Sequence, residues 1–168
     1  PDTEPFLGAL MSRIEISIAD QTLRLLTDSG EQSWSVSTAL NGSGNLKGSG
    51  CTPLGQHKVK LKIGESAPIN SVFVGRRSTG EIYSETLAKQ YPERDWILTR
   101  IIWLQGMESG FNRGGQVDTL SRFIYIHGTP DTEPMGVPKS HGCIRMRNQD
   151  LIELFDQVNN NMIVNITA

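Results

Sequence analysis

The sequence predicts a mainly β fold, arranged as a curved β-sandwich with one or two short helices. Apolar residues alternate with polar ones over residues 14–25 and 57–63, which is the spacing of strands with one buried face. Glycine-rich loops separate such runs, as in Asn41 to Gly50, where four of ten residues are glycine. An apolar stripe at helical spacing occurs near the end of the chain, in residues 148–158.

The first half of the chain is expected to be rich in strands. Residues 13–25 alternate around a turn at residues 19–21 and predict an opening hairpin. Residues 32–40 predict a third strand, after which the glycine-rich loop follows. Residues 57–63 alternate again and therefore predict a further strand of the same domain.

The second half is expected to combine strands with two helices. Ser84 is a candidate N-cap of a short helix that ends at Gln90, because Pro92 follows and cannot continue it. Asn148 is a candidate cap of the helix that ends near residue 158. Strands are predicted at three further places: residues 95–104, 122–127 and 162–166.

Two long loops flank the strand predicted at residues 122–127. Gly106 to Thr119 is glycine-rich, and loops of this length in compact domains are usually functional, so we expect it to cover a substrate. Thr129 to Ser140 contains three prolines, which restrict the backbone dihedral φ. This second loop is therefore expected to hold its shape.

The chain is expected to form one domain. Its 168 residues, 37% hydrophobic and 20% charged, are ordinary for a globular domain with a real core. Residues 1–10 follow neither a helical nor a strand period, and Met11 immediately precedes the first alternating run. We therefore expect a single catalytic domain over residues 11–168, with Met11 as candidate initiator and residues 1–10 as an added N-terminal tail.

Net charge disfavours two classes of binding partner, and hydropathy indicates the cellular compartment of the protein. A net charge of −2 disfavours nucleic acid or an anionic membrane surface, since both demand a basic face. No run approaches the roughly 18 apolar residues of a membrane span, and no basic-then-apolar leader opens the chain. A cytoplasmic location is therefore expected, with the periplasm or cell envelope as the alternative if a signal peptide was removed. No cofactor is expected, and the oligomeric state is not predicted.

The segment Ser140–Met146 has the residue types of a nucleophilic site. A thiolate is a far better nucleophile than a thiol, so a catalytic Cys143 needs a base or a positive field that lowers its pKa. His127 and His141 both lie within sixteen positions of it. Gly142 allows close approach, so the backbone amides of Gly142 and Cys143 are candidate donors to a developing oxyanion. The pattern predicts acyl transfer.

Three other roles for Cys143 compete with that of a nucleophile. A zinc site is disfavoured, because His141-x-Cys143 lacks the spacer of structural zinc sites and Cys51 is far away in sequence. A Cys51–Cys143 disulfide would silence the nucleophile and stays open. A purely structural cysteine usually lies in an apolar run, whereas Cys143 lies among Ser, His, Gly and Arg.

These residues resemble the signature of the L,D-transpeptidase catalytic domain, or YkuD-type, family: a His-Gly pair followed after a short loop by Ser-His-Gly-Cys. His127-Gly128 and Ser140–Cys143 match it residue by residue. Thr52–Gly55 resembles its Thr-Pro-x-Gly segment, although His57 stands where an aromatic residue is usual. The resemblance covers most of residues 13–166 and implies a β-sandwich catalytic domain that acts on peptidoglycan stem peptides or muropeptides.

The resemblance implies roles for the two candidate bases. His127 would draw the proton from Cys143, while the carbonyl of Gly128 orients the other ring nitrogen of His127. His141 shares a face with Cys143 if this segment is extended, so geometry alone also allows it as the base. Otherwise His141 is expected to line the substrate or to steady the oxyanion.

Three further residues are expected to bind substrate. Arg145 is two residues after Cys143, so the two side chains lie on the same face if this segment is extended. A guanidinium can bind a carboxylate through two hydrogen bonds. A salt-bridged structural role for Arg145 is the alternative. Ser140 and Thr129, which border the two motifs, are the other candidates.

The implied reaction cleaves the L,D bond between the third-position diamino acid and D-Ala through a thioester on Cys143. Attack by water would make the chain an L,D-carboxypeptidase of muropeptide recycling, which is the favoured reading. Attack by an amine would make it an L,D-transpeptidase that forms 3-3 cross-links or exchanges D-amino acids. An inactive peptidoglycan-binding module is a remote alternative. A papain-like protease is disfavoured, because here the base precedes the cysteine in sequence.

Overall fold

The structure is a computed structural model that describes residues 12–168. The predicted N-terminal tail, residues 1–10, and the candidate initiator Met11 lie outside the described residues. No helix of the described part is long and apolar enough to cross a membrane.

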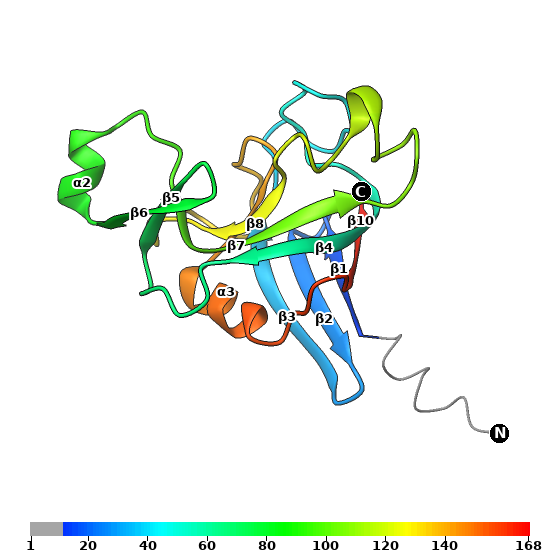
Figure 1. The fold of residues 1–168 in the computed structure, drawn as a ribbon, viewed down its shortest axis with the longest axis horizontal. Coiled ribbons are helices and arrows are strands. Elements are labelled where there is room, and N and C mark those ends of the chain that lie inside the picture. Colours follow the sequence, from blue (N-terminus) through cyan, green and yellow to red (C-terminus); the bar gives the residue numbers. More distant parts are fainter. Residues whose placement is uncertain (1–11) are drawn as a thin grey trace.

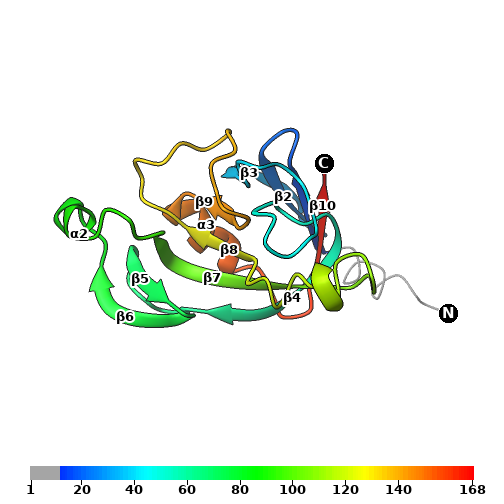
Figure 2. The same cartoon turned by 90° about the horizontal axis from the view of Figure 1, so that it is seen from above.

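The predicted mainly β fold is confirmed, and the sheet is curved so strongly that it closes on itself. Its strands are β1 Arg13–Ser17, β2 Thr22–Thr27, β3 Gly30–Ser37, β4 Gly55–Ile63, β5 Ser71–Val74, β6 Arg77–Ile82, β7 Ile97–Gly106, β8 Tyr125–Gly128, β9 Ile144–Met146 and β10 Ile163–Thr167. Their order is β4-β10-β1-β2-β3-β9-β8-β7-β5-β6, and β4 also pairs with β7 (Figure 1). The hairpin β5–β6 projects beyond the closed part, together with α2 (Figure 2).

Two helices were predicted from local signals, and both occur within residues 12–168, with two corrections. Helix α2, Glu85–Gln90, begins as expected, because the Ser84 hydroxyl oxygen accepts a hydrogen bond of 3.1 Å from the Leu87 amide. Helix α3, Asn148–Phe155, ends before the predicted end near residue 158 and packs its buried residues against β7 and β8. The N-cap of α3 is Arg147, not Asn148, whose side chain points into the protein instead. A 3-10 turn, η1, spans Gly115–Val117.

Strand boundaries differ from the prediction where tertiary contacts decide them. The strand predicted at residues 32–40 ends at Ser37, because the Thr38 carbonyl accepts hydrogen bonds from the amides of Lys139 and Ser140. The strand predicted at residues 122–127 begins only at Tyr125. Strands β5 and β6 were not predicted, since β6 is largely exposed and polar and so lacks alternation.

The candidate site lies where two strands run parallel. β8 and β9 are parallel neighbours with His127 opposite Arg145 and Ile126 opposite Ile144. Both strands are buried along their whole length against a core that includes Ile102 and Leu154. The parallel pairing therefore brings the two sequence motifs side by side on a rigid part of the sheet.

Candidate active site

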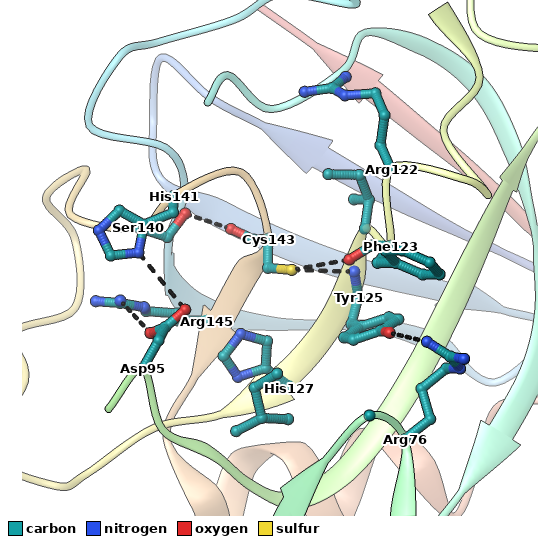
Figure 3. A pocket seen from close by; sticks show the side chains of 13 residues that line it. Arg76, Asp95, Arg122, Phe123, Tyr125, His127, Ser140, His141, Cys143 and Arg145 are labelled. Carbon is teal, nitrogen blue, oxygen red and sulfur yellow. Dashed lines mark hydrogen bonds and ion pairs between the residues drawn. The ribbon is translucent and has the colours of Figure 1, made fainter. Parts of the chain in front are cut away.

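Cys143 opens into a pocket of about 430 Å³ (Figure 3). The pocket walls come from the ends of β7, β8 and β9, the turn between β5 and β6, and the two segments that precede β8 and β9. Its lining residues are Gly75, Arg76, Asp95, Ile97, Arg122, Phe123, Ile124, Tyr125, His127, Ser140, His141, Cys143 and Arg145. A pocket of this size suits one end of a peptide.

The sulfur of Cys143 has two backbone partners. It donates to the carbonyl oxygen of Phe123 at 3.4 Å and accepts from the amide of Tyr125 at 3.3 Å. Burial raises the pKa of Cys143 to about 12, against the opposing effects of the Tyr125 amide and the nearby arginines. The resting group is therefore a thiol, because the net effect of its surroundings is to raise its pKa.

The backbone around this sulfur has an uncommon conformation. Phe123 has a φ of 57°, a left-handed value that is strained for a bulky residue. This conformation ends the approach to β8 and aims the Phe123 carbonyl at Cys143. Strain of this kind is characteristic of functional sites.

His127 is buried and fixed in one tautomer. Its Nδ1 lies 2.7 Å from the carbonyl oxygen of Gly128, which can only accept, so Nδ1 carries the proton and Nε2 keeps a free lone pair. Burial lowers the pKa of His127, which leaves the ring neutral and able to take up a proton. By contrast, His141 is 77% exposed and lies 3.5 Å from Asp95.

Asn148 packs closely against Gly128 at the end of the His127 strand, β8. The Asn148 amide nitrogen donates to the Thr129 carbonyl at 2.9 Å, and its oxygen accepts from the Thr99 hydroxyl at 2.6 Å. A Cβ at position 128 would collide with the Asn148 oxygen and lie 2.6 Å from the Leu98 carbonyl. Glycine is therefore required at position 128 for close packing. Thr129 is itself only 2% exposed and borders a second pocket, not the one that Cys143 lines.

Ser140 stabilises the turn that presents Cys143. Its hydroxyl donates to the Cys143 carbonyl at 2.6 Å and accepts from the Gly142 amide at 3.2 Å. The Thr52 hydroxyl donates to the Gly142 carbonyl at 2.8 Å from the opposite side. Gly142 has a φ of 137°, which favours glycine. The Gly142 amide is thus already partnered within the turn, so the expected pair of oxyanion donors is only partly available in this state.

Asp95, which the sequence did not single out, connects two of the predicted site residues. One carboxylate oxygen lies 3.1 Å from the Arg145 guanidinium, and the other lies 3.5 Å from His141. Arg145 is buried and also lies 3.8 Å from Glu133. The structure therefore favours the ion-paired alternative for Arg145 in the resting state. Asp95 precedes β7 without any motif, so only the tertiary fold could have revealed it.

A second, smaller pocket lies beyond this ion-paired cluster. Its volume is about 240 Å³, and it shares Asp95, His141 and Arg145 with the first pocket. A third hollow, of about 460 Å³, adjoins the first pocket on another side and is bordered by Lys47, Gly48 and Arg122. Arg122 there donates to the Cys51 carbonyl at 2.6 Å.

The loop at residues 106–119 does not cover the pocket, contrary to expectation, because none of its residues lines the pocket wall. Buried Asn112 ties this loop to the beginning of β4, donating to the carbonyls of Leu54 at 3.1 Å and Gln56 at 3.0 Å. His57 adds a second tie, 2.9 Å from the Thr119 hydroxyl. The segment is therefore fastened to β4.

The two cysteines are both free, so the Cys51–Cys143 disulfide considered above is not formed. The Cys51 sulfur contacts the carbonyl oxygens of Asn41 and Ser49 at 3.6 and 3.7 Å. Within residues 12–168, no group of three or more His, Cys, Asp or Glu side chains is arranged to hold a metal ion.

Comparison with known proteins gives a family match. The sequence model of the L,D-transpeptidase catalytic domain, YkuD, matches residues 11–166. No curated protein sequence matches the chain. The matched region contains all the residues that line the pocket.

Solved structures match the fold at low sequence identity. An L,D-transpeptidase from Mycobacterium smegmatis is 16% identical with a TM-score of 0.54, over 94% of this chain and 58% of that chain. L,D-transpeptidase 3 from Mycobacterium tuberculosis, in complex with a faropenem-derived adduct, is 15% identical with a TM-score of 0.57. The match covers 94% of this chain and 60% of that chain. An L,D-transpeptidase in complex with imipenem is 16% identical with a TM-score of 0.55, over 93% and 58%. This chain thus spans about three fifths of the length of these structures.

Proposed function

Since the chain belongs to the L,D-transpeptidase catalytic-domain family, we propose that it is a cysteine-dependent L,D-carboxypeptidase of peptidoglycan stem peptides. The observation that carries the proposal is that Cys143 and the neutral, oriented His127 line one pocket. A nucleophile and a base with its orienting group are the parts that acyl transfer requires. The substrate bond would be the L,D bond between the third-position diamino acid and D-Ala.

The first half-reaction forms the thioester, and it begins with a protonated Cys143 thiol and a His127 ring whose Nε2 is free to accept a proton. His127 Nε2 takes the proton of the Cys143 thiol as sulfur attacks the substrate carbonyl, since the thiol is protonated at rest. His127 then returns that proton to the departing amine of D-Ala as the carbon–nitrogen bond breaks. A thioester to the third residue remains on Cys143, and the Gly128 carbonyl stabilises the charged ring that forms transiently.

Hydrolysis completes the cycle. Water gives a proton to His127 and attacks the thioester carbonyl. As the carbon–sulfur bond breaks, His127 returns that proton to the leaving sulfur, which restores the Cys143 thiol and releases the tripeptide, whose new carboxyl group ionises at neutral pH. We favour water over an amine because the Asp95–Arg145 ion pair, with His141 beside it, lies on one flank of the pocket, and the hollow beyond it is small. That flank offers little room for a second stem.

Transpeptidation is the second candidate, and one observation favours it. The 460 Å³ hollow beside Arg122 and Phe123 adjoins the pocket and is large enough for part of an acceptor stem. If an amine from that side reached the thioester before water, the product would be a 3-3 cross-link or an exchanged D-amino acid.

Product analysis separates the two candidates. A disaccharide tetrapeptide is incubated with the protein in the presence of excess acceptor stem, and products are identified by mass spectrometry. Tripeptide and free D-Ala as main products support hydrolysis. Abundant dimers linked between two third-position residues, or replacement of D-Ala by an added D-amino acid, would make the chain a transpeptidase.

Cys143→Ala tests the nucleophile in either case. Because the substitution removes the attacking sulfur, turnover should fall by at least about 10³-fold. Because it removes little side-chain volume, the fold should be retained. Because imipenem and a faropenem-derived adduct occur in two similar structures, we also propose that a carbapenem acylates Cys143. Added mass on the wild-type protein, and none on the alanine variant, is the expected result.

A further inference from the structure

Arg76 occupies a strained turn at the pocket rim. Gly75 and Arg76 form the two-residue connection between β5 and β6, with Val74 paired to Arg77. Both have positive φ, 56° for Gly75 and 66° for Arg76, as in a type I′ turn. Such positions are dominated by Gly, Asn and Asp, because other side chains are strained there. Arginine at the second position is therefore structurally unfavourable, and strain of this kind concentrates at ligand clamps and active sites.

Aromatic side chains hold the Arg76 guanidinium in place. Its central carbon lies 4.8 Å from the ring centroid of Trp103 and 4.8 Å from that of Phe123. One of its nitrogens donates to the Tyr125 hydroxyl at 3.2 Å (Figure 3). The backbones of Phe123 and Tyr125 are the groups that contact the Cys143 sulfur. Arg76 is thus fixed by the same residues that position the nucleophile.

The charge of Arg76 is not neutralised within the described part of the chain. The contacts of Arg76 among residues 12–168 are two rings and a phenol, with no carboxylate. The other two arginines of the pocket are engaged, Arg145 by Asp95 and Arg122 by backbone carbonyls. Among residues 12–168, one of the five N–H groups of Arg76 has a hydrogen-bond acceptor. The remaining donors are free for a ligand.

We propose that Arg76 is a specificity-determining residue that binds a free carboxylate of the stem peptide in the Cys143 pocket. A planar guanidinium stacked on aromatic rings presents its edge in a fixed direction, which suits recognition of a carboxylate by two hydrogen bonds. The inference rests on the proposed function for the identity of the substrate. Two carboxylates of a tetrapeptide stem have this chemistry, that of the terminal D-Ala and that on the side chain of the diamino acid.

Three substrates and four proteins test the proposal. The substrates are a tetrapeptide with both carboxylates free, one with the D-Ala carboxylate amidated, and one with the diamino-acid carboxylate amidated. The proteins are the wild type, Arg76→Gln, Arg76→Lys and the matched control Arg77→Gln, which removes the same charge from an exposed neighbour outside the pocket wall. The rate of D-Ala release gives kcat and KM for each pair.

Arg76→Gln should raise KM for the free tetrapeptide by about tenfold with a smaller change in kcat, as expected for loss of a charge-assisted contact. Arg76→Lys should recover part of this loss, and Arg77→Gln should behave as the wild type. The penalty of Arg76→Gln should vanish for the one amidated substrate that lacks the recognised carboxylate, which also identifies that carboxylate. An equal penalty on all three substrates would mean a merely structural role and would overturn the proposal, as would no penalty at all.

A binding measurement keeps the inference separate from the proposed function. If the wild type releases no D-Ala, the carboxypeptidase proposal fails, and calorimetric binding of the tetrapeptide to Cys143→Ala with and without Arg76→Gln decides the role of Arg76. Roughly tenfold weaker binding with the second substitution supports carboxylate recognition. Equal binding, or no binding to either variant, overturns it.

Discussion

The thiol of Cys143 donates a hydrogen bond of 3.4 Å to the carbonyl oxygen of Phe123. A carbonyl can only accept, so this contact is made by the protonated sulfur and would be lost on ionisation. The left-handed backbone of Phe123 aims the carbonyl at the sulfur. In the mechanism proposed above, this contact keeps Cys143 protonated until a substrate displaces it or His127 removes the proton.

Alkylation kinetics test this protonation state. Because burial raises the pKa of Cys143 to about 12, its reaction with iodoacetamide should be slow at neutral pH and rise about tenfold per pH unit from about pH 8 to 10. Peptide mapping by mass spectrometry separates Cys143 from Cys51. A plateau reached below about pH 8 would instead indicate a resting thiolate.

The choice of base gives a second prediction. His127→Ala should slow carbapenem acylation at pH 7 by about 10²–10⁴-fold, the usual contribution of a general base. His141→Ala should slow it by less than about tenfold, because this side chain is 77% exposed and its neighbour Asp95 is partly exposed as well. The rates are measured by mass spectrometry of both variants after the reaction is quenched at successive times. If His141→Ala were the slower protein, the assignment of the base would be reversed.

Ser140 offers a test of the turn. Ser140→Ala removes the hydroxyl that bridges the Cys143 carbonyl and the Gly142 amide, so it should lower the free energy of unfolding by about 1–3 kcal/mol. Acylation should slow as well, since the turn orients the sulfur. Ser35→Ala, at an exposed site on β3, is the matched control and should leave urea unfolding unchanged. Loss of substrate affinity without loss of stability would restore the expected binding role of Ser140.

His57 makes stability depend on pH. Burial lowers the pKa of His57 to about 4, from 6.5 in its unperturbed state, so the unfolded chain binds a proton as pH falls through 6.5 while the folded chain does not. Stability should therefore be lost between about pH 6.5 and 4, and by pH 4.5 this residue contributes up to about 2.5 kcal/mol of that loss.

His57→Phe removes this titration. The difference in unfolding free energy between wild type and variant should change in favour of the variant as pH falls from about 7 to 4.5. Thr119→Val, which removes only the hydroxyl partner of His57, controls for the lost hydrogen bond. A constant difference across this pH range would contradict the prediction. Guanidinium unfolding at several pH values provides the measurement.

Local signals predicted much of the fold. The Ser84 cap and the alternation of the first hairpin depend on neighbouring residues alone, and both are confirmed. The strand pair β5–β6 was missed because its exposed, polar second strand shows no hydrophobic period. Asn148 has a residue type that suits a cap, but contacts with distant Thr99 and Thr129 determine its position.

The sequence predicted the motif residues of the candidate site but not the residues from other segments that complete the pocket wall. Cys143, His127 and His141 do line one pocket, whereas the loop at residues 106–119 does not, because buried Asn112 fastens it elsewhere. Arg76 and Asp95 come from segments far away in sequence and carry no motif. The roles assigned to these side chains, and the cytoplasmic location, stay predictions.

The parallel pairing of β8 with β9 requires a connecting loop that can vary in length while the register of the two strands stays fixed. The register that sets His127 opposite Arg145 is fixed by the sheet, while the connecting loop crosses from one strand to the other with a largely exposed tip at residues 131–137. Extra residues inserted at such a tip add little loop-closure entropy and leave the strands in place. This crossover is therefore a point at which a further module could be inserted close to Cys143 without changing the register of β8 and β9.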